Sequence, residues 1–243
     1  MSHKNVLITG ASRGIGRAIA LYFIEKDYNT ILVCKGDISR MNDLKEKAEG
    51  NNLSCLCYSL DISEFSNIEE IFYDLNNRNI TIDILINNAG ISHVGLLQDM
   101  SIDEWNSSIS TNLSSVFFTS KMVIPHMLSK GAGKIINISS VWGVCGASME
   151  VAYSTTKGGI NAFTKALAKE LAPSNIQVNA IACGAVDTEM NGHLDDYEKE
   201  MLINEIPAGR MATPSDVASF VYGIATSNNY LTGQIINFDG GWI

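Results

Sequence analysis

Short apolar runs alternate with longer stretches of helical pattern along nearly the whole chain. The apolar runs predict strands near residues 5–9, 29–34, 53–59, 82–87, 134–139, 176–181 and 234–238. The longer stretches predict helices near residues 15–26, 40–49, 64–77, 103–130, 152–171 and 215–227. Repeated alternation of this kind predicts an α/β fold, a doubly wound parallel sheet of about seven strands with helices on both faces.

Residues that carry chemistry follow most of these strands. They are Gly10, Cys34, Asp61, Asn87, Ser140 and Cys183. Ligands of such sheets bind at the carboxyl ends of the strands, so these positions are expected to converge on one site. At 243 residues, a single domain spanning 1–243 fits the length better than two small ones. Between Thr188 and Pro214 the alternation gives way to a charged, helical insertion.

Charge, hydropathy and cysteine content narrow the function classes. A net charge of −9 disfavours nonspecific binding to nucleic acid. No apolar stretch reaches the roughly 18 residues that span a bilayer, and the first strand follows Lys4 too closely to leave room for a signal peptide. Five cysteines without a C-x-x-C pair favour a reduced, cytoplasmic protein. No metal site is expected, because four scattered histidines lack ligand spacing: His3, His93, His126 and His193.

Tyr153 and Lys157 form the most informative pair in the chain. Four residues apart on an expected helix, they lie one above the other on a single face. A free tyrosine has a pKa of about 10, and a nearby cation lowers it. A phenol tuned in this way can protonate an oxygen as a hydride reaches the adjacent carbon. The spacing occurs by chance in many helices, so it indicates a catalytic pair only when other motifs of the same chemistry are present.

A glycine-rich turn follows the first expected strand and reads Gly10-Ala11-Ser12-Arg13-Gly14-Ile15-Gly16. A strand, a glycine turn and a helix form the context of a dinucleotide site, where the backbone approaches a pyrophosphate at a helix N-terminus. The spacing is G-x-x-x-G-x-G and not the commoner G-x-G-x-x-G. A structural turn would explain the glycines alone, but their position at the first strand–helix junction favours a dinucleotide.

With these motifs the chain resembles the short-chain dehydrogenase/reductase family, of the compact type with little beyond one Rossmann domain. Further segments match in family order: Leu60-Asp61-Ile62, Asn87-Asn88-Ala89-Gly90, Gly184-Ala185-Val186-Asp187-Thr188 and Asp239-Gly240-Gly241. The resemblance implies hydride transfer between a nicotinamide cofactor and a carbonyl or alcohol. The catalytic residues that it implies are Asn112, Ser140, Tyr153 and Lys157.

The resemblance also implies a role for each catalytic residue. Tyr153 would donate the proton in reduction, Lys157 would lower its pKa and bind the nicotinamide ribose, and Ser140 would orient the substrate oxygen. Asn112 would mark a helix distortion that holds a proton-relay water for Lys157. Ser139 is expected to point to the other face of its strand. The expected cofactor contacts are Gly10, Ser12, Arg13, Gly14, Ile15, Gly16, Lys35, Asp61, Ile62, Asn88, Ala89, Gly90, Tyr153, Lys157, Gly184, Val186 and Thr188.

Charge near the adenosine 2′ position decides between NADP and NAD. NAD users of the family commonly carry an acid at the end of the second strand, where this chain has Cys34 followed by Lys35. Lys35 and Arg13 together favour a 2′-phosphate, and hence NADPH. Asp37 leaves NAD open as the alternative, because a small shift of the turn would bring its carboxylate to the ribose.

Within the family the chain most resembles the bacterial 3-oxoacyl-[acyl-carrier-protein] reductases, which implies a carrier-bound or small-molecule 3-oxoacyl thioester as substrate. That group docks its acidic carrier with arginines, and the corresponding stretches 129–134 and 173–175 contain none. Lys130 and Lys134 would be the substitutes, without the bidentate fork of arginine.

The chain also resembles a subgroup of reductases that act on the 5-aminopentanone group carried on a lysine of elongation factor P. This resemblance rests on Trp142 and Glu150, taken with Gly184-Ala185-Val186-Asp187-Thr188 and Gly240-Gly241-Trp242. Glu150 or Asp187 would then pair with the ammonium of that substrate. In the competing interpretation Glu150 is solvated and Trp142 packs under its loop. The candidate substrate residues are Ser140, Trp142, Glu150 and Tyr153, with His93 and Met190 as further guesses for the pocket.

Three expectations complete the sequence analysis. A non-catalytic NADP-binding sensor is the alternative outside the enzyme class, and the retention of Tyr153 and Lys157 counts against it. Relatives usually assemble as tetramers through the helices near 103–130 and 152–171, so a homo-oligomer is expected, with no nucleic-acid or membrane partner. The resemblance makes residues 188–214 a mobile lid over the substrate, and an ordinary surface excursion is the alternative.

Overall fold

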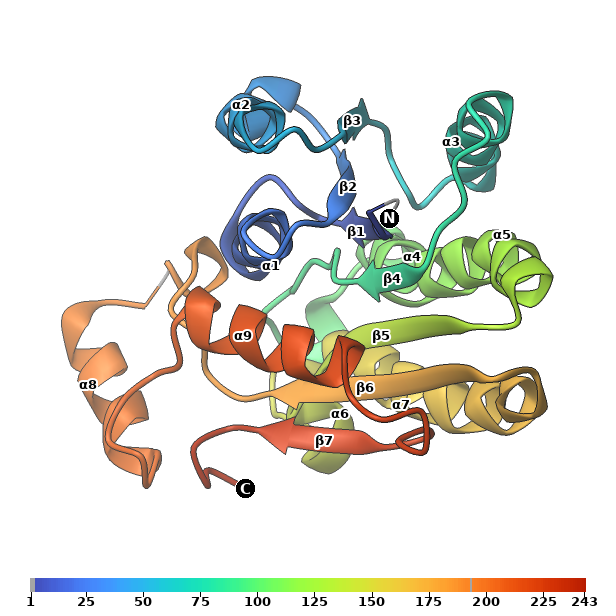
Figure 1. Ribbon diagram of the computed structural model, residues 1–243. Coiled ribbons are helices and arrows are strands. Elements are labelled where there is room, and N and C mark those ends of the chain that lie inside the picture. Colours follow the sequence, from blue (N-terminus) through green and yellow to red (C-terminus); the bar gives the residue numbers. More distant parts are fainter. Residues whose placement is uncertain (1–2, 193) are drawn as a thin grey trace.

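The computed structural model describes residues 3–192 and 194–243, and across them the strands form one parallel sheet (Figure 1). The strand order is β3-β2-β1-β4-β5-β6-β7, with every neighbouring pair parallel. The strands are β1 (Asn5–Thr9), β2 (Asn29–Cys34), β3 (Cys55–Ser59), β4 (Ile84–Asn87), β5 (Gly133–Ser140), β6 (Ile176–Cys183) and β7 (Ile235–Phe238).

Helices connect these strands. The α-helices are α1 (Gly14–Ile24), α2 (Asn42–Gly50), α3 (Phe65–Asn77), α4 (Ile102–Ile109), α5 (Ser115–Lys130), α6 (Trp142–Cys145), α7 (Val151–Leu171), α8 (Asp196–Glu205) and α9 (Pro214–Ala225). The short helices are η1 (Ile38–Met41), η2 (Leu97–Asp99), η4 (Ala172–Ser174) and η5 (Glu189–Asn191), and η3 (Ser110–Ser114) is a π-helical turn. None of the helices in the described residues is long and apolar enough to cross a membrane.

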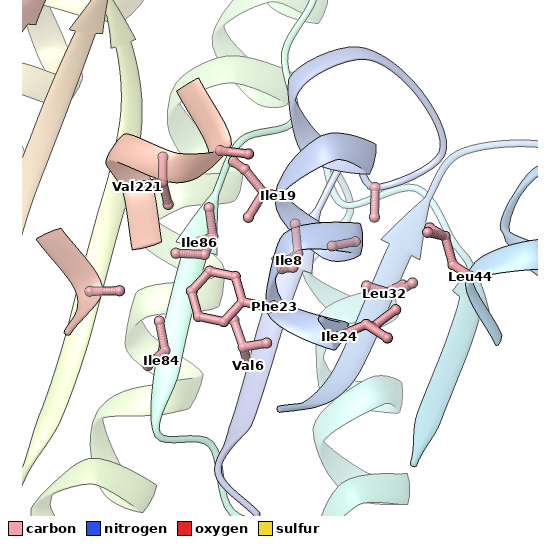
Figure 2. Packing of buried hydrophobic residues seen from close by; sticks show 14 of the residues in the cluster. Val6, Ile8, Ile19, Phe23, Ile24, Leu32, Leu44, Ile84, Ile86 and Val221 are labelled. Carbon is pink, nitrogen blue, oxygen red and sulfur yellow. The ribbon is translucent and has the colours of Figure 1, made fainter. Parts of the chain in front are cut away.

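Alternate residues of the central strand β1 face opposite helix layers. Val6 and Ile8 pack with α1, α2 and α9, whereas Leu7 packs with α3, α5 and α7. Burial on both faces explains why the strand reads as a continuous apolar run and not as an alternating one. Figure 2 shows the Phe23 ring of α1 lying over β1 and β4, where it is fully buried.

The direction of winding reverses between β1 and β4. From β1 the chain proceeds to β2 and β3 on one side of the sheet, and from β4 to β5, β6 and β7 on the other. Connections that leave two neighbouring strands in opposite directions open a crevice at their carboxyl ends, where such folds bind ligands. Gly10 and Asn88 begin the two segments that leave these strands. The structure thus places the expected cofactor turn at the topological switch point.

The α/β class is confirmed, and each strand boundary lies within two residues of its predicted position. The predicted helix over 103–130 is present as one helical stretch, which the π-turn at Ser110–Ser114 divides into α4 and α5. The four-residue α6 was not expected, since so short a helix has no periodic signal. Residues 188–214 contain η5 and α8, and α8 lies beyond the carboxyl ends of the strands (Figure 1). His193 lies outside the described residues.

Candidate active site

The glycine turn after β1 packs so closely on the end of β4 that side chains are excluded from it. A Cβ at Gly16 would lie 2.2 Å from the Gly10 carbonyl oxygen, and a Cβ at Gly10 would lie 2.8 Å from Ala89 Cα. Asn88 ties the two segments together, because its Nδ2 donates to the carbonyls of Thr9 (3.0 Å) and Gly10 (3.3 Å). These contacts fix the shape of the turn.

The helix after the turn presents backbone donors toward the crevice. α1 begins at Gly14, and no side chain of the described residues caps its first turn at Arg13. First-turn N–H groups lack partners inside a helix and carry partial positive charge, which suits a pyrophosphate. Ser12 and Ile15 belong to the same turn. The residues present therefore fit a dinucleotide whose pyrophosphate lies against the start of α1.

The remaining segments expected at the cofactor meet between this turn and the catalytic residues. A Cβ at Gly90 would lie 3.4 Å from Asn112 Oδ1 and 3.7 Å from Lys157 Nζ, so the loop after β4 lies directly beside these two residues. A Cβ at Gly14 would lie 3.4 Å from Thr188 Cγ2, which brings the start of the segment after β6 over the glycine turn. Two further expected residues, Gly184 and Val186, lead into that segment, and Val186 is buried.

Helix α7 places Tyr153 and Lys157 on one face, as their spacing predicts. Lys157 Nζ lies 5.4 Å from the centroid of the Tyr153 ring and donates to the Ile138 carbonyl at 2.8 Å. Lys157 is only 4% exposed, so its charge lies almost entirely inside the protein. A Cβ at Gly143 would lie 2.6 Å from the Lys157 carbonyl carbon, so this glycine lets α6 approach the catalytic helix.

Asn112 lies in the π-helical turn that separates α4 from α5, and it is fully buried. Its Oδ1 accepts from the Ile91 N–H at 2.8 Å, and its Nδ2 donates to the Ile91 carbonyl at 2.8 Å and to Thr156 Oγ1 at 3.2 Å. The expected helix distortion is present. Asn112 therefore joins the loop after β4 to the catalytic helix.

The two serines at the end of β5 have different surroundings, as strand alternation predicts. Ser139 donates to Asn161 Oδ1 at 2.7 Å and is held against α7. Ser140 interacts with the Tyr153 phenol, and its Oγ accepts from the Trp142 N–H at 3.2 Å. Because the backbone donor occupies a lone pair of Oγ, the Ser140 hydroxyl proton can be directed at a substrate oxygen. The structure brings Ser140, and not Ser139, to Tyr153.

Burial dominates the acid–base properties of the pair. It raises the pKa of Tyr153, and the nearby Cys183 and Glu150 raise it further, while the hydrogen bond with Ser140 lowers it. Burial lowers the pKa of Lys157 to about 8. The cation argument from the sequence predicts a lowered tyrosine pKa, whereas in the folded site the pKa of Tyr153 is raised and burial is the largest cause. A neutral phenol is the form that can give up a proton in a reduction.

Aromatic rings and carboxylates surround the side of the site where a substrate would enter. The rings of Trp142 and Trp242 lie 4.9 Å apart between centroids at an angle of 60°, and Trp242 Nε1 donates to Glu205 at 3.3 Å. Glu150 accepts from Ser92 Oγ at 2.7 Å. The C-terminus, α8 and the loop after β5 therefore meet beside Ser140.

Cations and carboxylates alternate at the opposite, adenosine end. Lys35 Nζ lies 2.6 Å from Asp61 Oδ2, and Arg13 Nη1 lies 2.8 Å from Glu189 Oε2. Asp37 accepts from the Ser39 N–H at 2.8 Å and so caps η1. The neighbouring Ile62 is buried in the core.

The sequence did not indicate several residues that lie at the substrate side and at the adenosine end of the site. Arg40 on η1 lies 4.0 Å from Glu189, and Ser92 holds Glu150, but each pair is far apart in the chain and leaves no local signal. Of the further pocket candidates, His93 Nδ1 lies 3.4 Å from Glu104 Oε1, which links its loop to α4. Met190 lies on η5.

Comparison with known proteins agrees with the class that the fold and site define. The family model described as short chain dehydrogenase matches residues 4–199, and the chain belongs to this family of oxidoreductases. It is 38% identical to the 3-oxoacyl-[acyl-carrier-protein] reductase FabG of Thermotoga maritima over 99% of this chain and 98% of that protein. It is 36% identical to an uncharacterized oxidoreductase of Bacillus subtilis, YmfI, over 99% of each chain.

A solved structure shares the fold over the same length. It is a candidate gluconate dehydrogenase from Agrobacterium tumefaciens, with a TM-score of 0.93 and 31% identity. The match covers 98% of this chain and 95% of that one. The single seven-stranded sheet across the described residues is thus the architecture of the family.

Proposed function

We propose that the protein is an NADPH-dependent carbonyl reductase that converts a 3-oxoacyl thioester into its 3-hydroxyacyl form. The observation that carries the proposal is the convergence of Ser140, Tyr153 and Lys157 at the carboxyl ends of the strands, beside the glycine turn. The similarity to 3-oxoacyl-[acyl-carrier-protein] reductases over nearly the whole chain supports the substrate class.

NADPH bound along the turn would supply a hydride to the carbonyl carbon. Tyr153 donates its proton to the carbonyl oxygen as negative charge develops there, and burial keeps this phenol protonated beforehand. Ser140 donates a hydrogen bond to the same oxygen and fixes its position between the two hydroxyl groups.

Lys157 and Asn112 support the proton transfer. The Lys157 ammonium beside the ring stabilises the phenolate that Tyr153 becomes, because an opposite charge at short range favours the ionised form. Asn112 holds the Ile91 main chain and Thr156 in place, and it would hold the relay water that returns a proton to Lys157. These residues position the proton donor and restore its proton.

Three cations at the adenosine end support NADPH over NADH. Arg13, Lys35 and Arg40 come from the glycine turn and the segment after β2, where a 2′-phosphate would lie. Asp37, which would favour NADH, is engaged in capping η1 through Ser39. Guanidinium groups match phosphate geometry and are always charged.

The first test is the rate of NADPH oxidation with acetoacetyl-CoA, followed by carrier-protein thioesters, for wild type and Tyr153→Phe. We expect turnover by the wild type, a loss of about 10³-fold in the variant, and retained binding of NADPH. Binding of NADPH without turnover of any ketone by the wild type would reject the reductase and favour a non-catalytic sensor.

A second candidate substrate is the 5-aminopentanone group on elongation factor P. Glu150 lies near the Tyr153 phenol and is held by Ser92, which gives the pocket a carboxylate suited to an ammonium. The test compares an amine-bearing ketone with its uncharged analogue for wild type and for Glu150→Gln combined with Asp187→Asn. The candidate predicts that the double variant loses the preference for the amine, and an unchanged preference would reject it.

We also propose a homotetramer. Ile102, Phe117 and Leu128 are large apolar side chains exposed on α4 and α5. A second apolar surface lines a cavity of about 490 Å³ between α9 and β7, and it includes Phe220 and Phe238. Two such surfaces support two kinds of subunit contact. Light scattering coupled to gel filtration tests the assembly, and a monomer at micromolar concentration would contradict it.

A further inference from the structure

A carboxylate of the lid lies between two arginines at the adenosine end of the cofactor site. Glu189 Oε2 is 2.8 Å from Arg13 Nη1 and 4.0 Å from Arg40 Nη1. Arg13 belongs to the glycine turn, Arg40 to η1 after β2, and Glu189 to η5 at the start of the lid. One carboxylate thus joins three segments that are distant in the chain.

These contacts resemble an anion-binding site in which the bound anion is the Glu189 carboxylate of the protein itself. Two guanidinium groups converge on one acceptor oxygen, which is the arrangement that binds phosphate in many proteins. The ion pair is also easy to exchange, because the side chains of Arg13 and Glu189 are 61% and 60% exposed. Exposed pairs of this kind contribute at most about 1 kcal/mol, so an external anion of higher charge can replace the carboxylate.

The start of the lid is anchored on the cofactor turn by a second contact next to this one. A Cβ at Gly14 would lie 3.4 Å from Thr188 Cγ2, so Thr188 packs on the turn that faces the pyrophosphate. Asn191 Nδ2 donates to the Val186 carbonyl at 2.8 Å and closes η5. Release of Glu189 would therefore free one attachment of the lid and leave its neighbour in place.

We propose that Glu189 occupies the position of the cofactor's 2′-phosphate and leaves Arg13 and Arg40 when NADPH binds, which makes it a determinant of cofactor preference. This inference rests on the NADPH assignment proposed above. A phosphate monoester carries about −1.5 to −2 charges at neutral pH against −1 for a carboxylate, so it is the stronger partner for two guanidinium groups. The ribose hydroxyl of NADH carries no charge, and Glu189 then stays on the arginines.

The test measures the dissociation constants of 2′,5′-ADP and 5′-ADP by calorimetry for wild type, Glu189→Gln and Glu200→Gln. Glu200 is an exposed carboxylate on α8, so its replacement removes the same charge from the lid. We expect Glu189→Gln to bind 2′,5′-ADP about threefold more tightly, within the range of an exposed ion pair, and to bind 5′-ADP as before. Glu200→Gln changes neither constant.

Hydrogen exchange of residues 188–192 provides a second readout. In the wild type we expect faster exchange with 2′,5′-ADP than with 5′-ADP, and in Glu189→Gln fast exchange with both. Unchanged or weaker 2′,5′-ADP binding by Glu189→Gln would overturn the inference, and weaker 5′-ADP binding would make Glu189 a ribose ligand instead. If the wild type binds 2′,5′-ADP and 5′-ADP equally, the NADPH assignment is overturned as well. If the wild type prefers 2′,5′-ADP and Glu189→Gln has the same preference, only the proposed replacement of Glu189 by the 2′-phosphate is overturned.

Discussion

The two ends of the cofactor site hold their polar groups in different ways. At the catalytic end Asn112 and Lys157 are buried, and each is bonded to the main chain of another segment. At the adenosine end Arg13 and Lys35 are mostly exposed and are held by carboxylates. Removing a buried group leaves its partner without water or protein, whereas an exposed ion pair is readily replaced. The catalytic end is therefore rigid, and the adenosine end is adjustable.

The largest expected effect comes from Lys157→Met at the rigid end. Turnover should fall by about 10³-fold, because the cation that stabilises the Tyr153 phenolate is gone. The same variant should be more stable than the wild type. Burial lowers the pKa of Lys157 from 10.5 to about 8, which corresponds to about 3 kcal/mol of unfavourable burial of the charge. Loss of the hydrogen bond to the Ile138 carbonyl offsets about 1 kcal/mol of this, so we expect a net gain of about 2 kcal/mol.

The pH dependence of this difference has a defined sign. Below about pH 8 both the folded and the unfolded wild type are protonated at Lys157, so the cost of burying the charge is complete. Between about 8 and 10.5 the folded state loses the proton first, and the wild type gains stability relative to the variant. Urea denaturation at several pH values measures the difference, with Lys165→Met on the exposed face of α7 as control. A variant less stable than the wild type at every pH would contradict the argument.

A smaller effect is expected for Asn112→Ala. Both polar main-chain groups of Ile91 lose their partner, and each unsatisfied group costs about 1–3 kcal/mol. Partial access of water to the loop limits the total, so we expect a loss of about 3 kcal/mol in the free energy of unfolding and about 10²-fold in turnover. Hydrogen exchange should rise in the loop of residues 91–96 before it rises in the sheet. Asn106→Ala, on the exposed face of α4, is the matched control, and equal effects of the two variants would argue against a rigid catalytic end.

The comparison also explains which features the sequence predicts. Local spacing places Tyr153 and Lys157 on one face of α7, and apolar runs locate the strands, because both patterns arise from regular geometry over a few residues. The π-turn has a weaker local signal in Ser110-Thr111-Asn112-Leu113-Ser114, a run of mostly poor helix formers. Its cause, the bonds from Asn112 to the Ile91 main chain, depends on tertiary structure.

Contacts between segments that are distant in the chain cannot be predicted from such local patterns. Ser92 and Glu150 are 58 residues apart, and Arg13 and Glu189 are 176 apart, so no periodicity relates them. The sequence predicts a lowered pKa for Tyr153, and the opposite direction in the structure also arises from contacts between distant segments. A sequence shows that a cation is near, but the desolvation that raises the pKa of Tyr153 depends on how the fold encloses the phenol.

The smallest expected effect is that of Arg40→Met at the adjustable end. Arg40 is half-exposed and lies 4.0 Å from Glu189, so its contribution to binding a 2′-phosphate is that of a solvent-screened charge. We expect the dissociation constant for NADPH to rise about threefold at 0.15 M salt and that for NADH to stay unchanged, with Arg78→Met, at the C-cap of α3, as control. The effect should shrink further as salt is raised, because screening weakens exposed interactions more than buried ones. A loss of NADPH affinity of about 30-fold or more that does not depend on salt would show that Arg40 becomes buried when the cofactor binds. The contrast between the rigid and the adjustable end would then hold only for the protein without cofactor.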